Sequence, residues 1–110
     1  METKNKVLSY IGFALKAGKI CKGVNAVETL KNDVFLLIIC HTASENTYKD
    51  AEKLALKFHC PLIVSEKVTV EEITLKENCK LIALTDKNLA EAVIKNSNED
   101  FTIYSGGRKV

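Results

Sequence analysis

Three lysines precede a glycine in the stretch LKAGKICKGVNAVETLK, which spans residues 15–31. They recur at a spacing of three residues: Lys16, Lys19 and Lys22. Gly23 then opens a short amphipathic segment, where unpaired backbone N–H groups at a helix start favour a phosphate. Asn25 offers both a donor and an acceptor to a base edge. These residue types suit a nucleic-acid contact, in which lysines meet phosphates and an amide meets a base.

The positive charge is concentrated in the first third of the chain. The 110 residues carry a net charge of only +2, so the global charge does not identify a nucleic-acid binder. Residues 1–31 hold six lysines against two glutamates, whereas the remaining 79 residues hold 10 cations and 12 anions. This asymmetry, +4 against −2, directs attention to the N-terminal segment.

Apolar periodicity predicts helices that alternate with short buried strands. Apolar residues at helical spacing predict helices over residues 5–18, 24–32, 44–59 and 87–96, and the capping-box pattern TVEE predicts a short helix from residue 69. Continuous apolar runs predict strands buried on both faces over residues 34–40, 61–65 and 80–86. This alternation predicts an α/β fold, a three-layer α/β/α sandwich around a small mixed sheet.

We expect one domain over residues 1–96 and a C-terminal tail over residues 97–110. The Asn, Ser and Gly content of the tail suggests loose structure, although Phe101, Ile103 and Tyr104 could pin it to the body. The N-terminus is polar, and the longest apolar run is far too short to span a bilayer. Four single cysteines are typical of reduced thiols in a cytosolic protein. We therefore expect a cytoplasmic protein without a membrane segment.

The sequence predicts neither catalysis nor a cofactor. It contains no Ser/His/Asp or Cys/His pattern with supporting signals, no Walker-type glycine loop and no Rossmann fingerprint. The pairs Cys40-His41 and His59-Cys60 would suit a metal only if they lay together. They flank opposite ends of two strands expected to be parallel, and a six-residue strand is roughly 20 Å long. We therefore expect no metal site.

Four segments together resemble the L-seven-Ae and L-thirty-e superfamily of ribosomal proteins, which bind kink-turn RNA. The segments are LSYIGFALKAGKICKGVNAV, LLIICHTASENT, CPLIVSEK and LIALTDKNLAEAV, and the match runs over roughly residues 5–95. The resemblance is strongest to the small bacterial, ribosomal-protein-like members. It implies an α/β/α sandwich that binds a sharply bent internal loop of RNA, called a kink-turn.

The resemblance implies which residues of the second predicted helix would contact RNA. Gly23, Val24 and Asn25 match the first three positions of the family's Gly-x-Asn-Glu recognition segment. Ala26 stands where many members have Glu, and Thr29 stands where they have Lys. These two differences remove an RNA-facing acceptor and a phosphate contact, so binding is expected to be weaker or directed at another RNA shape.

Further contacts are implied on both sides of this segment. Lys19 and Lys22 can reach the two backbones across the bend. The family's second element is a loop here near residues 65–70, which places Lys67 and Val68 at flipped-out bases. The Leu-Gly-x-x-x-Gly pattern that follows in the family is replaced by VEEITLKE, with neither glycine.

The expected function is therefore non-catalytic binding of a kink-turn or similarly bent RNA, in association with the ribosome or another structured RNA. We expect a monomer when the protein is free. The alternative is a protein–protein adaptor that has lost RNA binding, as some relatives of this fold have. A cationic patch around Gly23 favours RNA binding, whereas a large exposed apolar patch there favours the adaptor.

Overall fold

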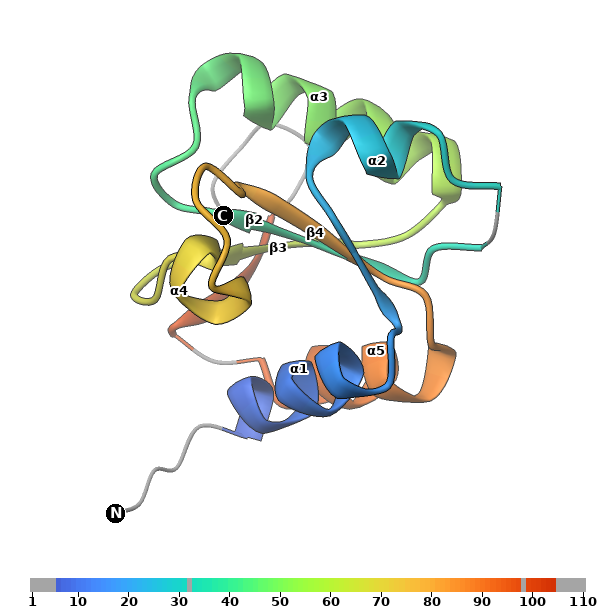
Figure 1. Ribbon diagram of the computed structural model, residues 1–110, viewed down its shortest axis with the longest axis vertical. Coiled ribbons are helices and arrows are strands. Elements are labelled where there is room, and N and C mark those ends of the chain that lie inside the picture. Colours follow the sequence, from blue (N-terminus) through green and yellow to red (C-terminus); the bar gives the residue numbers. More distant parts are fainter. Residues whose placement is uncertain (1–5, 32, 98, 105–110) are drawn as a thin grey trace.

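The protein alternates helices and short strands, as the computed structural model shows for residues 6–31, 33–97 and 99–104 (Figure 1). The elements in chain order are α1 (Lys6–Lys16), β1 (Ile20–Lys22), α2 (Val24–Glu28), β2 (Leu36–Cys40), α3 (Glu45–Phe58), β3 (Leu62–Ser65), α4 (Val70–Thr74), β4 (Leu81–Leu84), α5 (Lys87–Lys95) and β5 (Phe101–Tyr104). The predicted alternation is confirmed.

The strands form one open mixed sheet in the order β1-β4-β2-β3-β5. The central pair β2 and β3 is parallel, while β4 is antiparallel to β1 and β2, and β5 is antiparallel to β3. As a result β1, β2 and β3 all finish at the same end of the sheet, which we call the carboxyl end. The connections that follow these strands meet there, beside the starts of β4 and β5.

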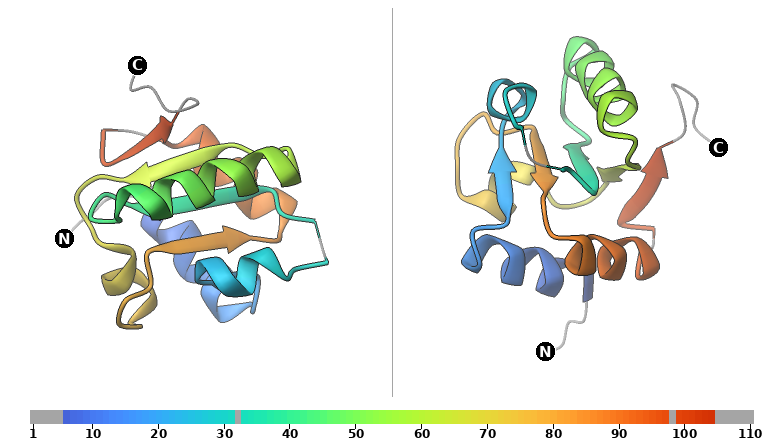
Figure 2. Two further views of the ribbon diagram at one scale, coloured as in Figure 1. Left: turned by 90° about the horizontal axis from the view of Figure 1, so that it is seen from above. Right: turned by 90° about the vertical axis from the view of Figure 1, so that its right-hand side faces the viewer.

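Helices cover both faces of the sheet, which confirms the predicted three-layer α/β/α sandwich. Helices α2 and α3 lie on one face, and α1 and α5 lie on the other together with α4 (Figure 2). Every residue of β2 is fully buried: Leu36, Ile38 and Cys40 pack toward α1 and α5, and Leu37 and Ile39 pack toward α2 and α3. A strand covered on both faces needs no polar positions, which explains its continuous apolar run.

Local capping explains where the helices begin. The Ser44 hydroxyl accepts the Thr47 N–H at 3.2 Å at the start of α3. At α4, the Thr69 hydroxyl accepts the Glu72 N–H at 3.0 Å, and the Glu72 carboxylate accepts the Thr69 N–H at 3.0 Å. This is the capping box that the sequence predicts, with two N–H groups satisfied reciprocally. Helix α2 is shorter than predicted: it ends at Glu28, whereas the sequence pattern predicted a helix up to residue 32.

The predicted domain boundary at residue 96 is wrong, because the sheet extends into the segment expected to be a loose tail. Strand β5 pairs with the free edge of β3, with Phe101 opposite Ser65 and Tyr104 opposite Leu62. The Phe101 side chain is 0% exposed and packs with the residues beneath α1 and α5. The strand β5 has only four residues, and polar and glycine-containing stretches flank it in the sequence. The composition of these stretches led to the expectation of a loose tail. Residues 105–110 of the expected tail lie outside the described residues.

The parallel arrangement of β2 and β3 separates the two Cys-His pairs, as predicted. The register places Cys40 beside Ser65, and the His41 Nδ1 lies 2.9 Å from the Ser65 carbonyl oxygen at the carboxyl end. His59 and Cys60 instead precede the start of β3. In the part of the chain that the structure describes, no three His, Cys, Asp or Glu side chains gather so as to hold a metal ion. The described helices include none with the length and apolar character needed to span a bilayer.

Candidate nucleic-acid interface

A hollow of about 400 Å³ at the carboxyl end of the sheet brings together residues from three parts of the chain. We call it the basic hollow. Its lining residues are Lys22, Gly23, Val24, Asn25 and Ala26 from the β1–α2 junction, Thr47 from α3, and Lys76, Asn78 and Lys80 from the α4–β4 connection. Five of the predicted site residues therefore lie together.

The β1–α2 junction is held in place through backbone bonds on both sides of Gly23. Its N–H donates to the Leu81 carbonyl at 2.7 Å, and its carbonyl accepts the Val27 N–H at 3.0 Å. The φ of Gly23 is 92°, a conformation that glycine adopts without strain. The Val27 side chain is fully buried, which leaves Asn25 and Ala26 exposed at the start of α2.

The α4–β4 connection forms the other wall, and Glu71 of α4 fixes its conformation. One oxygen of the Glu71 carboxylate accepts the Asn78 N–H at 2.8 Å, and the other accepts from Lys80 Nζ at 3.0 Å. The hydrogen bond from Lys80, followed by that from Asn78, lowers the pKa of Glu71. Lys80 Nζ also donates to the Thr42 hydroxyl at 3.0 Å, so its ammonium group is held in one position.

The lining of the basic hollow is cationic and amide-rich. Its charged residues are Lys22, Lys76 and Lys80, and the described residues that line it include no carboxylate. Glu71, which does not line the hollow, forms an ion pair with Lys80 and offsets its charge. Lys22 and Lys76 take part in none of the ion pairs of the described residues. Two asparagines, Asn25 and Asn78, add donors and acceptors. The arrangement can therefore bind phosphates and hydrogen-bond to polar groups between them.

Four predicted site residues do not line the basic hollow. Thr29 follows the last turn of α2, where its hydroxyl donates to the Ala26 carbonyl at 2.9 Å. Lys19 lies at the far end of β1 from Lys22, and its carbonyl accepts the Thr85 N–H at 2.9 Å. Lys67 forms an ion pair of 3.7 Å with Asp100, beside β5. Val68 is half-buried, and its carbonyl accepts a hydrogen bond from Ser65.

Residues 76, 78 and 80 were missed because only the sheet topology brings them near Lys22. The antiparallel pairing of β1 and β4 places Lys22 opposite Ile82, so the residues before β4 lie beside the start of α2. A run of alternating lysines and an asparagine, KENCK, was the available signal in the sequence. It carries no information on its own, because the order β1-β4 is not encoded by local pattern.

Leu75 stands next to this wall in a strained conformation. Its side chain is 90% exposed, and its φ of 58° is in the left-handed region, where a Cβ is disfavoured. The sequence has no glycine here, although the family pattern noted above is glycine-containing.

Leu75→Gly is therefore expected to raise the free energy of unfolding by about 0.5 kcal/mol. Release of the left-handed strain gains about 1–2 kcal/mol, and the greater freedom of glycine in the unfolded chain takes back about 0.5–1 kcal/mol. Leu56→Gly is the matched control, because Leu56 is 75% exposed but lies within α3. That change should cost about 1 kcal/mol. Urea denaturation measures both, and a loss of stability in Leu75→Gly would contradict the strain argument.

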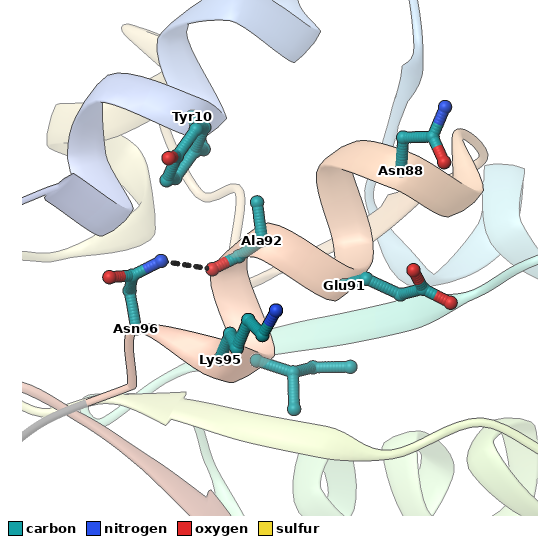
Figure 3. A pocket seen from close by; sticks show the side chains of 7 residues that line it. Tyr10, Asn88, Glu91, Ala92, Lys95 and Asn96 are labelled. Carbon is teal, nitrogen blue, oxygen red and sulfur yellow. Dashed lines mark hydrogen bonds between the residues drawn. The ribbon is translucent and has the colours of Figure 1, made fainter.

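A second hollow, of about 510 Å³, lies between α1 and α5 (Figure 3). Tyr10 of α1 points toward Ala92 of α5, and the Asn96 side chain donates to the Ala92 carbonyl at 2.8 Å. Its charged residues are one of each sign, Glu91 and Lys95. This hollow therefore lacks the cationic character of the basic hollow.

The large exposed apolar side chains are distributed over separate elements. Among the described residues they are Phe13 on α1, Leu56 on α3, Leu75 after α4 and Ile103 on β5. Lysines and amides, rather than an apolar patch, surround Gly23.

Comparison with known proteins supports the fold. No protein-family model matches the sequence, and no curated protein matches it. Among solved structures, the chain is similar to a protein of unknown function from Bacillus halodurans, with a TM-score of 0.69. The two are 22% identical, and the match covers 84% of this chain and 96% of that one. At this identity the likeness concerns the α/β architecture alone.

Proposed function

We propose that the protein is a non-catalytic RNA-binding protein that holds a sharply bent, kink-turn-like RNA in the basic hollow. One observation carries the proposal: the residues that the sequence resemblance assigns to RNA at the β1–α2 junction share a concave surface with Lys76, Asn78 and Lys80. The resemblance assigned none of these three residues to RNA, although Lys76 lies in the stretch VEEITLKE that replaces the family's glycine pattern. Two parts of the chain that are distant in sequence thus contribute lysines and asparagines to one surface.

The roles of the side chains follow from their positions. Lys22 from β1 and Lys76 from the α4–β4 connection both line the hollow, so each can meet a phosphate of the two backbones that converge at a bend. Asn25 is exposed at the start of α2, so that its amide is available to the edge of an unpaired base. Gly23 has no Cβ, and nothing lies within 4 Å of the place a Cβ would occupy, so a backbone can approach closely.

The departures from the family pattern are partly offset by this second wall. Thr29 supplies no charge and bonds to the α2 backbone, but Lys76 and Lys80 add cations on the opposite side. Ala26 lacks the hydrogen-bond acceptor that the family's Glu provides at this position. The Asn78 side chain, which lines the same hollow, can supply an acceptor instead. We further propose that the partner is ribosomal or another structured RNA in the cytoplasm, bound by a monomer.

Asn25→Ala tests the proposal at its central residue. We expect kink-turn RNA to bind about 1–3 kcal/mol more weakly, because the base partner is left unpaired. A straight duplex of equal length, which makes phosphate contacts, should bind as before. The free energy of unfolding should fall by at most about 1 kcal/mol, since Asn25 is exposed.

Asn88→Ala is the matched control, because Asn88 is an exposed asparagine in the first turn of α5. This variant should bind both the kink-turn RNA and the straight duplex as tightly as the unaltered protein. Unaltered kink-turn binding by folded Asn25→Ala would remove the recognition role of this residue, and the adaptor alternative would then explain the protein better. Filter binding or fluorescence anisotropy at fixed salt supplies the affinities.

A further inference from the structure

Two hollows follow the side of α3 that faces β5, on the sheet face that α2 and α3 cover. The first, of about 510 Å³, is lined by His41, Glu45, Tyr48, Val64, Glu66 and Tyr104. The second, of about 370 Å³, includes Glu52, Leu56, Cys60, Pro61, Leu62 and again Tyr104. Because Tyr104 lines both, we treat them as one groove and call it the α3–β5 groove. Figure 2 shows α3 above the sheet, with β5 at the sheet edge beyond it.

The first half of the α3–β5 groove combines carboxylates with aromatic rings. The rings of Tyr48 and Tyr104 lie 5.6 Å apart at an interplanar angle of 42°. The Tyr104 hydroxyl donates to Glu52 at 2.7 Å, and the Thr102 hydroxyl donates to Glu66 at 2.6 Å. No lysine or arginine is among the described residues that line either half. Aromatic faces beside carboxylates are the surroundings that bind a cationic side chain.

The pKa values of the two tyrosines in the groove are both raised. The hydrogen bond to Glu52, with burial and the nearby charges, raises the pKa of Tyr104 to about 12. Burial, followed by the charge of Glu66, raises the pKa of Tyr48. Both rings therefore stay neutral at physiological pH, and the negative charge of the groove resides on its carboxylates. A phosphate backbone would be repelled here, whereas a cation would be attracted.

The second half of the groove is apolar and open. Leu56 is 75% exposed beside Pro61, and Cys60 has a pKa raised to about 11 by burial, which keeps its thiol neutral. Residues of β3 line both halves, with Val64 in the first and Leu62 in the second. An extended segment can follow this strand with alternate side chains directed to one face.

We propose that the α3–β5 groove docks an extended segment of a partner protein that carries one arginine or lysine and one apolar side chain. The cation lies against the paired Tyr48 and Tyr104 rings and beside Glu66, and the apolar side chain packs against Leu56. Charge complementarity selects a basic segment. The distance between the halves follows β3: four residues from Leu62 to Glu66 correspond to about 13 Å of extended chain. The two anchors of the partner are therefore about four residues apart, and this surface is distinct from the basic hollow.

The test uses the full chain, labelled with ¹⁵N, and a blocked peptide in which three serines separate a leucine from an arginine. The control peptide carries citrulline, the neutral isostere of arginine. We expect saturable amide shifts at Glu45, Tyr48, Glu66 and Tyr104 with the arginine peptide. The citrulline peptide should bind about tenfold more weakly, since it lacks the charge-assisted contacts.

A double variant, Glu45→Gln with Glu66→Gln, should reduce binding of the arginine peptide to the level of the citrulline peptide. Gln at position 66 keeps an acceptor for the Thr102 hydroxyl, so the fold is preserved. Glu91→Gln on α5 is the matched control and should leave binding unchanged. Equal binding of both peptides, an unaffected double variant, or shifts confined to the basic hollow would overturn the proposal. Concentration-dependent self-association that the double variant abolishes would assign the groove to a second copy instead.

Discussion

Replacement of Phe101 by alanine is expected to lower the free energy of unfolding by about 3–5 kcal/mol. The ring is 0% exposed and is the largest fully buried side chain among the described residues. It belongs to one buried cluster with residues of β2, β3, β4, α1 and α5, so its removal leaves a cavity in a packed core. A domain of this size is stable by roughly 5–15 kcal/mol, so the loss is a large part of the total. Urea denaturation followed by circular dichroism measures it.

Ile103→Ala is the control from the same strand. Ile103 lies two residues further along β5 and is 51% exposed, so its truncation should cost under about 1 kcal/mol. A difference of several kcal/mol between the two variants is the signature of a strand packed into the domain. Equal, small effects would mean that residues 101–104 do not pack as a fifth strand and that the domain ends near residue 96.

Local pattern was sufficient to predict the inner elements of the fold. The capping box that begins at Thr69 and the buried runs of β2 and β3 are signals of a few consecutive residues, and each element lies where these signals place it. Strand β5 was missed because an edge strand needs no long apolar run. Phe101 faces the core, while its neighbours Thr102 and Ile103 are partly or largely exposed. Its role depends on a free edge of β3, which only the assembled sheet reveals.

The candidate site was predictable on one side only. The β1–α2 junction is contiguous in sequence, so the glycine and the residues around it could be recognised together. Lys76 and Lys80 join them through the antiparallel pairing of β1 and β4, and Glu71 fixes Lys80 across nine residues. Lys67, which the resemblance assigns to RNA, forms an ion pair of 3.7 Å with Asp100, the residue before β5. Such long-range pairs are not visible in the local sequence pattern.

The second prediction with a large expected effect concerns the lysines of the basic hollow. Simultaneous replacement of Lys22 and Lys76 by alanine is expected to weaken kink-turn RNA about thirtyfold, or about 2 kcal/mol. A straight duplex should lose a similar factor, because both lysines meet phosphates rather than bases. Lys80 is left in place, since its ammonium group holds Glu71 and Thr42 and its removal would disturb the wall itself.

The salt dependence separates this loss from a general change of charge. For the unaltered protein we expect log affinity to fall with log salt at a slope of about −2 to −4, and the double variant should be shallower by about 1.4–1.8. Lys53 and Lys95, exposed on α3 and α5, supply a control double variant of equal charge change. If the control loses as much affinity and slope, attraction is non-specific and the basic hollow is not the binding site. If only the Lys22 and Lys76 variant does, while Asn25→Ala weakens kink-turn RNA alone, charge and shape recognition act in one hollow through different residues.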